Sequence, residues 1–214
     1  MKLLLFSDLH ADRVAAQHIV ELADSADILI GAGDFANARR NLDNCIDVLR
    51  TVDRPTILVA GNNETTDELR AACQHWSFAH ILHGTEIRIN NITFYGVGGG
   101  IPVTPFGAWS YDFTEEQARE LLLNCPLHCV LITHSPPKGA VDVSSQGKNL
   151  GSVAISEAVE RLQPTLVVCG HIHASAGQQR FIGPTLVINP GPSGVEWQLA
   201  DPTSHRKCFT PCPA

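Results

Sequence analysis

The sequence predicts an α/β fold built on a mostly parallel, buried β-sheet. Short apolar runs with β propensity alternate with segments of helical period along most of the chain. The first run, KLLLF at residues 2–6, precedes a segment in which Ala15, Ile19 and Leu22 share one helical face. Such alternation of strand and helix is typical of parallel sheets.

The same alternation continues along the chain. Further strands are expected within 27–33, 55–61, 128–134, 164–173 and 185–191. Further helices are expected around Leu42, Ile46 and Leu49, from about Thr65, near 114–123, and after a Ser152 cap.

Antiparallel strands are expected in the middle of the chain. Apolar and polar residues alternate on both sides of Asn90-Asn91 within residues 81–97, which predicts a β-hairpin. Residues 101–113, rich in Pro, Gly and aromatic residues, predict a long irregular loop. We expect this loop to form one wall of a site.

The composition predicts one globular domain over residues 1–214. Apolar residues make up 44% of the chain and charged residues only 17%, which is enough for a substantial core. The formal charge of −7 and the lack of Lys/Arg runs exclude a long nucleic-acid duplex as the expected partner. No apolar run approaches the ~20 residues of a membrane span, so we expect a cytoplasmic protein without a membrane partner.

The cysteines predict a reducing compartment. Their number is odd, at seven, and no two have Cys-x-x-Cys spacing, so most are expected to be buried thiols. For Cys208 and Cys212, a metal site or a disulfide remains an alternative.

The polar residues that follow the apolar runs carry the functional signal. Five expected strand ends bear side chains of metal-ligand type, namely Asp8, His10, Asp34, Asn62, His134, His171 and His173. The carboxyl ends of strands converge on one crevice in an open α/β sheet. Imidazole, carboxylate and amide ligands without a thiolate suit Mn²⁺, Fe²⁺, Zn²⁺ or Mg²⁺. Seven ligands exceed the need of one tetrahedral ion, and a two-metal hydrolytic site would use them all.

Each motif also has a purely structural interpretation. Asp8-x-His10 could be turn chemistry, and Asp34 could cap the helix that follows it. GNNE at 61–64 could likewise be a turn with helix-capping residues, in which Glu64 leads into the helix expected from about Thr65. His171 and His173 are the stronger signal, because alternation in an extended segment would place both imidazoles on one side. The coincidence of all five motifs at strand ends favours the functional interpretation.

These motifs resemble, in order and spacing, the calcineurin-like metallophosphoesterase superfamily. The segments are SDLH, GAGDF, AGNNE, ITHSPP and CGHIH, and they span nearly the whole chain. The stretches HSPPKGAVD and PTLVVCGHIHASAG are most similar to the small bacterial-type phosphodiesterase branch. The resemblance implies two mixed β-sheets packed as a sandwich and flanked by helices, in four α/β/β/α layers.

The resemblance also implies roles for the candidate ligands. Asp8, His10 and His173 would hold a first metal ion, Asn62, His134 and His171 a second, and Asp34 would bridge the two. The expected cofactor is two divalent ions, Mn²⁺ first, with Fe²⁺, Zn²⁺, Ni²⁺ or Mg²⁺ as alternatives. The implied reaction is attack of a metal-bridging hydroxide on phosphorus.

The sequence departs from the family pattern at Asn63. The family has a catalytic histidine at this position, where it is taken to assist the leaving group, whereas an amide cannot deliver a proton near pH 7. General acid catalysis contributes typically 10²–10⁴-fold, so poor leaving groups should suffer most from its loss. Possible replacements are His75, His80, His83 and Tyr111, while Arg13, Lys138 and Lys148 could contact substrate, although each is more simply structural or at the surface.

The favoured function is a dinuclear metal-dependent phosphodiesterase acting on a small phosphodiester. One alternative is a phosphomonoesterase or phosphatase that uses the same site. The other is a catalytically weak, protein-binding scaffold of the same fold, which is expected to have lost ligands, whereas all seven positions are filled here. Exposed edge strands, expected in such a sandwich, would permit a homodimer.

Overall fold

A first mixed sheet forms one half of the molecule. The computed structural model describes residues 1–199, and within them the strands form two sheets, of five and six strands. The first sheet has the order β11-β1-β2-β3-β4. Its strands are β1 (Lys2–Phe6), β2 (Ile28–Gly31), β3 (Thr56–Leu58), β4 (Ala79–Ile81) and β11 (Val195–Gln198). All neighbours are parallel except β11, which runs antiparallel to β1.

The second sheet has the order β5-β6-β7-β8-β10-β9. Its strands are β5 (Thr85–Ile89), β6 (Ile92–Val97), β7 (Val130–Thr133), β8 (Leu166–Val168), β9 (Gln178–Ile182) and β10 (Thr185–Asn189). The inner strands are parallel and both edge strands are antiparallel to their neighbours. The sheet is therefore mixed, as expected.

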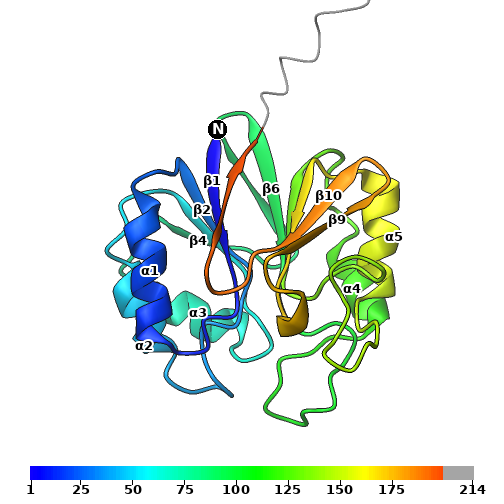
Figure 1. Ribbon diagram of the computed structural model, residues 1–214, viewed down its shortest axis with the longest axis horizontal. Coiled ribbons are helices and arrows are strands. Elements are labelled where there is room, and N and C mark those ends of the chain that lie inside the picture. The colour runs from blue at the N-terminus through cyan, green and yellow to red at the C-terminus, as the bar shows by residue number, and fades with distance from the viewer. Residues whose placement is uncertain (200–214) are drawn as a thin grey trace, which may run out of the picture.

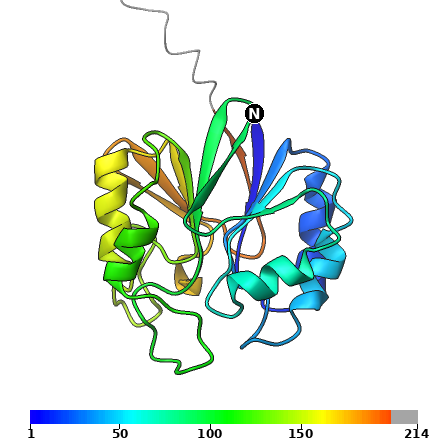
Figure 2. The same cartoon turned by 180° about the vertical axis from the view of Figure 1, so that it is seen from behind.

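Helices cover the outer face of each sheet (Figure 1, and from behind Figure 2). On the first sheet lie α1 (Arg13–Ala23), α2 (Leu42–Leu49) and α3 (Thr66–Ala72), and on the second lie α4 (Glu115–Leu121) and α5 (Val153–Leu162). A short 3₁₀ helix, η1 (His173–Ser175), precedes β9. The predicted four-layer sandwich is confirmed.

Strand alternation explains why the core strands are apolar on both faces. In β1, Leu4 and Phe6 pack with the helices outside, whereas Leu3 and Leu5 pack between the two sheets with residues such as Phe94. A strand buried on both faces reads as a continuous apolar run rather than an alternating one. This is why KLLLF carries the strand signal.

Local signals place the element ends where the sequence predicts them. Thr65 caps α3 in a capping box with Glu68, and Ser152 caps α5 through the Ile155 N–H. The hairpin turn at Asn90-Asn91 has φ values of 49° and 65°. Left-handed backbone at both central residues is what a tight hairpin turn requires.

Three short strands were not predicted from the sequence. β4, β9 and β11 lie at or beside sheet edges, and their side chains are mostly half-buried or exposed. Their apolar periodicity is therefore weak. The expected polar tail falls largely beyond the described residues, and Cys208 and Cys212 lie outside them. Cys45, Cys73, Cys125, Cys129 and Cys169 are buried free thiols, as predicted.

Candidate metal centre

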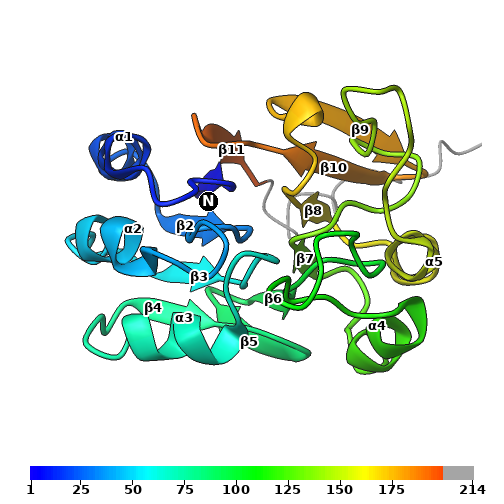
Figure 3. The same ribbon diagram turned by 90° about the horizontal axis from the view of Figure 1, so that it is seen from below.

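The carboxyl ends of five strands meet at one end of the molecule. Figure 3, seen from below, looks onto this end, where the loops after β1, β2, β3, β7 and β8 approach one another. These strands come from two facing sheets and not from one open sheet. The site thus sits where the two halves of the sandwich meet.

The predicted Asp and His residues form two groups with one shared member. The first group is Asp8, His10, Asp34 and His173, and the second is Asp34, His134 and His171. Within each group, one candidate ligand atom per residue lies within 4.8 Å of the others. The groups could hold a divalent metal ion, and Asp34 belongs to both.

The first group is centred on two imidazoles. The Nε2 atoms of His10 and His173 lie 2.9 Å apart. Asp34 Oδ2 lies 3.7 Å from His10 Nε2, and Asp8 Oδ1 lies 3.7 Å from His173 Nε2. Two ring nitrogens and two carboxylates therefore face a common point, which suits a divalent cation.

The second group is centred on His134. Its Nε2 lies 3.4 Å from Asp34 Oδ1 and 3.3 Å from Asn62 Oδ1. Its other ring nitrogen, Nδ1, donates to the Ala32 carbonyl at 2.8 Å. Such a second bond fixes the tautomer and leaves Nε2 free for a metal. The predicted Asn62 therefore lies with this group through its amide oxygen.

Several of these residues adopt backbone conformations that are unusual for residues with side chains. Asp8, His10, Asp34 and His171 have φ values of 57°, 46°, 59° and 68°. Left-handed backbone in non-glycine residues costs energy and persists where the surroundings hold it, often at functional sites. Here the N–H groups of Asp8 and His10 donate to the carbonyls of Gly33 and Asp34, each at 2.9 Å. These bonds hold the first two loops together.

Glycine is required where the loops approach the carboxylates. A Cβ on Gly170 would lie 2.6 Å from Asp8 Oδ2, and a Cβ on Gly61 would overlap Asp34 Oδ1. Gly170 and Gly61 therefore allow the loops after β8 and β3 to close around the two aspartates.

The electrostatics of the protein alone are those of a buried site that needs positive charge. Burial raises the pKa of Asp8. Burial would also raise the pKa of Asp34, but His134 overcomes this effect by charge and hydrogen bonding, so that pKa is held well below its usual range.

The pKa values of the two histidines of the second group are shifted in opposite directions. Burial opposes the charged form of His134, but Asp34 and Asp8 raise its pKa to about 9. Burial and the neighbouring His134 lower the pKa of His171 to about 3, which keeps this imidazole neutral. Buried carboxylates attract positive charge, and a divalent cation would supply it more completely than a proton.

Asn63 lies inside the site and contacts Asp34. Its side-chain Nδ2 donates to Asp34 Oδ2 at 2.6 Å, and its backbone N–H donates to Asp34 Oδ1 at 2.9 Å. Its side-chain oxygen accepts from the Ala38 N–H at 2.7 Å. Asn63 therefore holds Asp34 and the loop after β2 in place.

Glu64 has a role that the sequence did not reveal. It was expected to lead into the next helix, but it is fully buried and accepts from the N–H groups of Gly61, Asp34 and Ala36 at 2.7–2.9 Å. Burial, with Asp34 nearby, raises its pKa to about 7. One sequence signal for this role is that Thr65 and Glu68 already form the capping box of α3, so Glu64 is not needed to cap that helix.

The expectation of an extended Gly-His-x-His segment was wrong. β8 ends at Val168, His171 has left-handed backbone, and His173 opens η1. Asn189 Nδ2 donates to the Gly170 and Ile172 carbonyls at 3.3 and 3.1 Å and stabilises this turn. His171 and His173 consequently serve different groups rather than one common side.

The other candidates lie outside both groups. His83 Nδ1 accepts from the Gly98 N–H at 3.2 Å, and the Tyr111 hydroxyl donates to Thr66 at 3.3 Å. Arg13 begins α1 and is exposed, and the remaining candidates are half-buried or exposed, namely His75, His80, Lys138 and Lys148.

The 101–113 loop does reach the site. Asn62 Nδ2 donates to the Ser110 hydroxyl at 3.0 Å, and the Tyr111 N–H donates to the Asn62 carbonyl at 3.0 Å. Ser135, which follows His134, accepts from the Ile101 N–H at 2.8 Å. Both ends of the loop are therefore tied to residues of the second group or next to it.

Comparison with known proteins agrees with this geometry. A family model described as the calcineurin-like phosphoesterase superfamily domain matches residues 1–205. The chain belongs to the calcineurin-like phosphoesterase superfamily. Membership in this family agrees with the two groups of Asp and His residues, which could hold a divalent metal ion.

Named relatives lie at moderate sequence identity. A UPF0046 protein of Caenorhabditis elegans is 28% identical over 83% of the chain, and the human metallophosphoesterase domain-containing protein 1 is 32% identical over 56% of the chain. The alignments span 65% and 37% of the lengths of these relatives.

Solved structures of other proteins have a similar fold. The protein TT1561 of Thermus thermophilus superposes with a TM-score of 0.72 at 20% identity, covering 90% of both chains. A dimetal phosphatase from Danio rerio superposes with a TM-score of 0.60 at 13% identity, covering 88% of this chain and 86% of its own.

Within residues 1–199, no helix has the length and apolar character needed to cross a membrane.

Proposed function

We propose that the protein is a dinuclear metal-dependent phosphoester hydrolase that prefers phosphodiesters. A first ion would be held by Asp8, His10 and His173, a second by Asn62, His134 and His171, with Asp34 as the bridge. The observation that supports this proposal is that Asp34 belongs to both ligand groups, with one carboxylate oxygen near His10 and the other near His134. A carboxylate shared in this way is suited to a two-metal site.

The donor set fits borderline and hard divalent ions. Imidazole nitrogens with carboxylate and amide oxygens favour Mn²⁺ first, with Fe²⁺, Zn²⁺, Ni²⁺ or Mg²⁺ as alternatives. The Danio rerio neighbour is described as a dimetal phosphatase, which supports a pair of ions in this fold.

The roles of the chain's own residues follow from their contacts. When bound, the two ions supply positive charge to the phosphoryl oxygens and a nucleophile near neutral pH. Asp34 is oriented for both positions by Asn63, and His134 is oriented by the Ala32 carbonyl. The partly exposed His10 and His173 face the solvent from which substrate enters.

Asn63 supports the preference for substrates with good leaving groups. Its amide cannot deliver a proton, and one of its N–H groups is already directed at Asp34. A departing group therefore receives little help from this position. Aryl or otherwise stabilised phosphodiesters should be turned over better than simple alkyl esters.

The test is to saturate the purified protein with Mn²⁺, count the bound ions, and measure turnover. An activated aryl diester is compared with the matching monoester, and Asp67→Asn, which alters an exposed carboxylate on α3, is the control variant. We expect two ions per chain and faster turnover of the diester. No metal-dependent turnover of either ester would contradict the proposal, and fewer than two ions would favour the protein-binding scaffold.

A phosphomonoesterase is the second candidate function. The Danio rerio neighbour is described as a phosphatase, and the same ligand groups would serve a monoester. Faster turnover of the monoester in the same comparison would favour it.

A further inference from the structure

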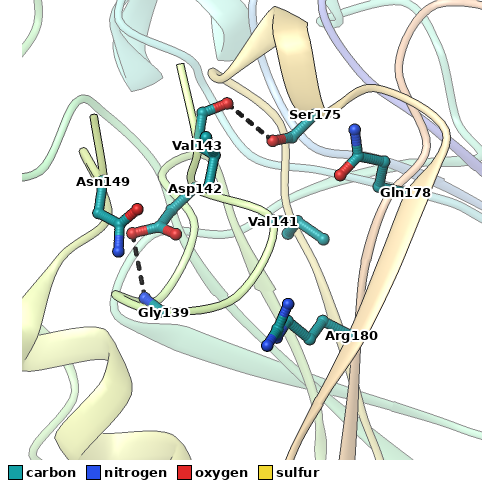
Figure 4. Close-up of a pocket in the computed structure, with 8 residues that line it drawn as sticks. All are labelled: Gly139, Val141, Asp142, Val143, Asn149, Ser175, Gln178 and Arg180. Atoms are coloured by element: carbon teal, nitrogen blue, oxygen red, sulfur yellow. Dashed lines mark hydrogen bonds between the residues drawn. The ribbon is translucent and has the colours of Figure 1, made fainter. Parts of the chain in front are cut away.

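A small cavity lies between the segments that follow His134 and His173 of the candidate metal centre. Figure 4 shows it between the loop after β7 and the start of β9. It encloses about 180 Å³ and is lined by residues that include Val141, Asp142, Asn149, Ser175, Gln178 and Arg180. Pockets for drug-sized ligands occupy roughly 300–1,000 Å³, so this cavity suits one small group.

The cavity shares its walls with the segments that carry the site histidines. Ser175 closes η1, which begins with His173, and the other wall belongs to the segment that follows His134. The Ser175 hydroxyl donates to the Val143 carbonyl at 3.1 Å and joins the two walls. A group in the cavity would therefore lie just past η1 from the candidate ligands.

Asp142 offers a buried acceptor to this cavity. The residue is only 1% exposed, and its Oδ2 accepts from the Gly139 and Gly151 N–H groups at 3.0 and 3.2 Å. These bonds account for its structural role in the loop. Its other oxygen, Oδ1, takes no hydrogen bond from the described residues and turns toward the cavity in Figure 4. No buried side-chain oxygen of the described residues lacks a hydrogen-bond partner, so Oδ1 is an oxygen that the cavity can reach and that can accept from a ligand or water there.

Donors and further acceptors come from the opposite wall. Arg180 on β9 faces the cavity, and no ion pair joins it to Asp142 in the described part of the chain. Gln178 uses its Nε2 to donate to the Ala174 carbonyl at 3.1 Å, which leaves its side-chain oxygen as an acceptor. Asn149 adds an amide with both functions.

The charges identify the class of ligand. The Asp142 carboxylate and the Arg180 guanidinium border the same cavity without forming an ion pair. Their charges balance, so the ligand that fits them carries no net charge. It must donate to Asp142 and accept from Arg180, and a hydroxyl group does both. Val141 supplies an apolar surface for ring carbons.

We propose that this cavity binds a neutral polyhydroxylated group, a single sugar ring or cyclitol, as the second arm of the phosphodiester. Assignment to the substrate rests on the proposed phosphodiesterase function. Binding of the free ring to the cavity does not depend on it.

The binding test uses the metal-free, ¹⁵N-labelled full chain and nuclear magnetic resonance. Methyl glucoside, methyl galactoside and myo-inositol are each titrated, and cyclohexanol is the control ligand. We expect saturable shifts of the Gly139 and Ser175 amide signals with at least one polyol and none with cyclohexanol. The absence of saturable shifts with all three polyols would overturn the proposal.

Two variants locate the binding. Asp142→Asn can keep the carbonyl oxygen for the loop bonds but presents an amide donor to the cavity, and Arg180→Met removes the guanidinium. Each is expected to weaken binding roughly tenfold, as loss of a charge-assisted hydrogen bond implies. Arg88→Met on β5, at the opposite edge of the same sheet, is the matched control and should bind like the unaltered protein. Unchanged affinity in both cavity variants would place the polyol elsewhere and overturn the proposal.

Kinetics then connect the cavity to the substrate. Two diesters with the same nitrophenyl leaving group are compared, one carrying the bound polyol and one carrying cyclohexyl. We expect kcat/KM to favour the polyol arm about tenfold, Arg180→Met to abolish that preference, and the Arg88→Met control to keep it. Turnover of neither diester would count against the proposed function, whereas equal turnover of both would count against the cavity as a substrate subsite.

Discussion

The two ligand groups differ in how far they are enclosed by the protein. The side chain of His134, in the second group, is 0% exposed, whereas those of His10 and His173, in the first, are 27% and 62% exposed. The first group opens onto a surface hollow of about 510 Å³ that Asp8, His10 and His18 help to line. The second is joined to the 101–113 loop by the hydrogen bond from Asn62 Nδ2 to the Ser110 hydroxyl.

The difference indicates a division of labour within one site. The second group is held by bonds that do not require a metal, such as that from His134 to the Ala32 carbonyl. Within residues 1–199, the Nδ1 atoms of His10 and His173 have no such partner. We therefore expect the second group to hold an ion tightly and the first to be the face where substrate and solvent exchange.

Removing the carboxylate of Asp34 should reduce turnover most, because Asp34 belongs to both ligand groups. In Asp34→Asn, both positions lose a negatively charged ligand. Metal ions contribute several kcal/mol of transition-state stabilisation, so we expect turnover of an aryl diester to fall on the order of 10³-fold. Assays of Asp34→Asn and the Asp67→Asn control at saturating Mn²⁺ check this. A variant that retains two ions and most of its activity would show that Asp34 is not the bridge.

Truncating one histidine in each group should separate their structural roles. His134→Ala removes a buried ring and leaves the Ala32 carbonyl without its partner, so we expect the metal-free protein to lose about 2–3 kcal/mol of unfolding free energy. His173→Ala removes an exposed ring and should change that free energy by less than about 0.5 kcal/mol. Urea unfolding of both metal-free variants measures these changes in unfolding free energy. Equal losses of unfolding free energy would mean that the two groups contribute equally to the stability of the fold.

Metal removal should proceed in two steps. Loss of a hydrogen bond that orients a metal ligand typically lowers metal affinity 10–100-fold. Within residues 1–199, only the second group has such a bond to a histidine ring, from His134 Nδ1 to the Ala32 carbonyl. We therefore expect a chelator to remove one ion from the first group at concentrations 10–100-fold below those that remove the other. Calorimetric Mn²⁺ titration of the stripped protein measures the two affinities, with His173→Ala identifying the weaker site. A single affinity for both ions would contradict the comparison.

Restoring a histidine at Asn63 should have the smallest effect. Asn63→His should raise turnover most for poor leaving groups, by roughly tenfold. This gain is below the full 10²–10⁴-fold of general acid catalysis, because the contacts of Asn63 with Asp34 and Ala38 must be rebuilt. A series of aryl diesters of graded leaving-group pKa measures this. Equal gains for good and poor leaving groups would mean that position 63 acts only by holding Asp34.

Much of the fold and of the candidate site could be predicted because each piece has a local signal. Apolar runs such as KLLLF mark strands buried on both faces, and Thr65 and Ser152 mark helix starts through their caps. The candidate ligands could be found because polar residues directly after an apolar strand are conspicuous. The edge strand β9 and the turn at His171 could not be predicted, since an exposed strand lacks apolar alternation and the turn depends on contacts from Asn189.

Local patterns in the chain were enough to specify the order of the main strands and helices, the chemical types of the candidate ligands and the family. These properties depend on periodicity and on residue identity. Three features emerged only from the folded arrangement: Glu64 is a buried tie between strand ends, a left-handed turn at His171 replaces the expected extended segment, and Asp142 and Arg180 border one cavity. Burial and hydrogen-bond partnership arise from segments far apart in sequence, and no local pattern encodes which segments will meet.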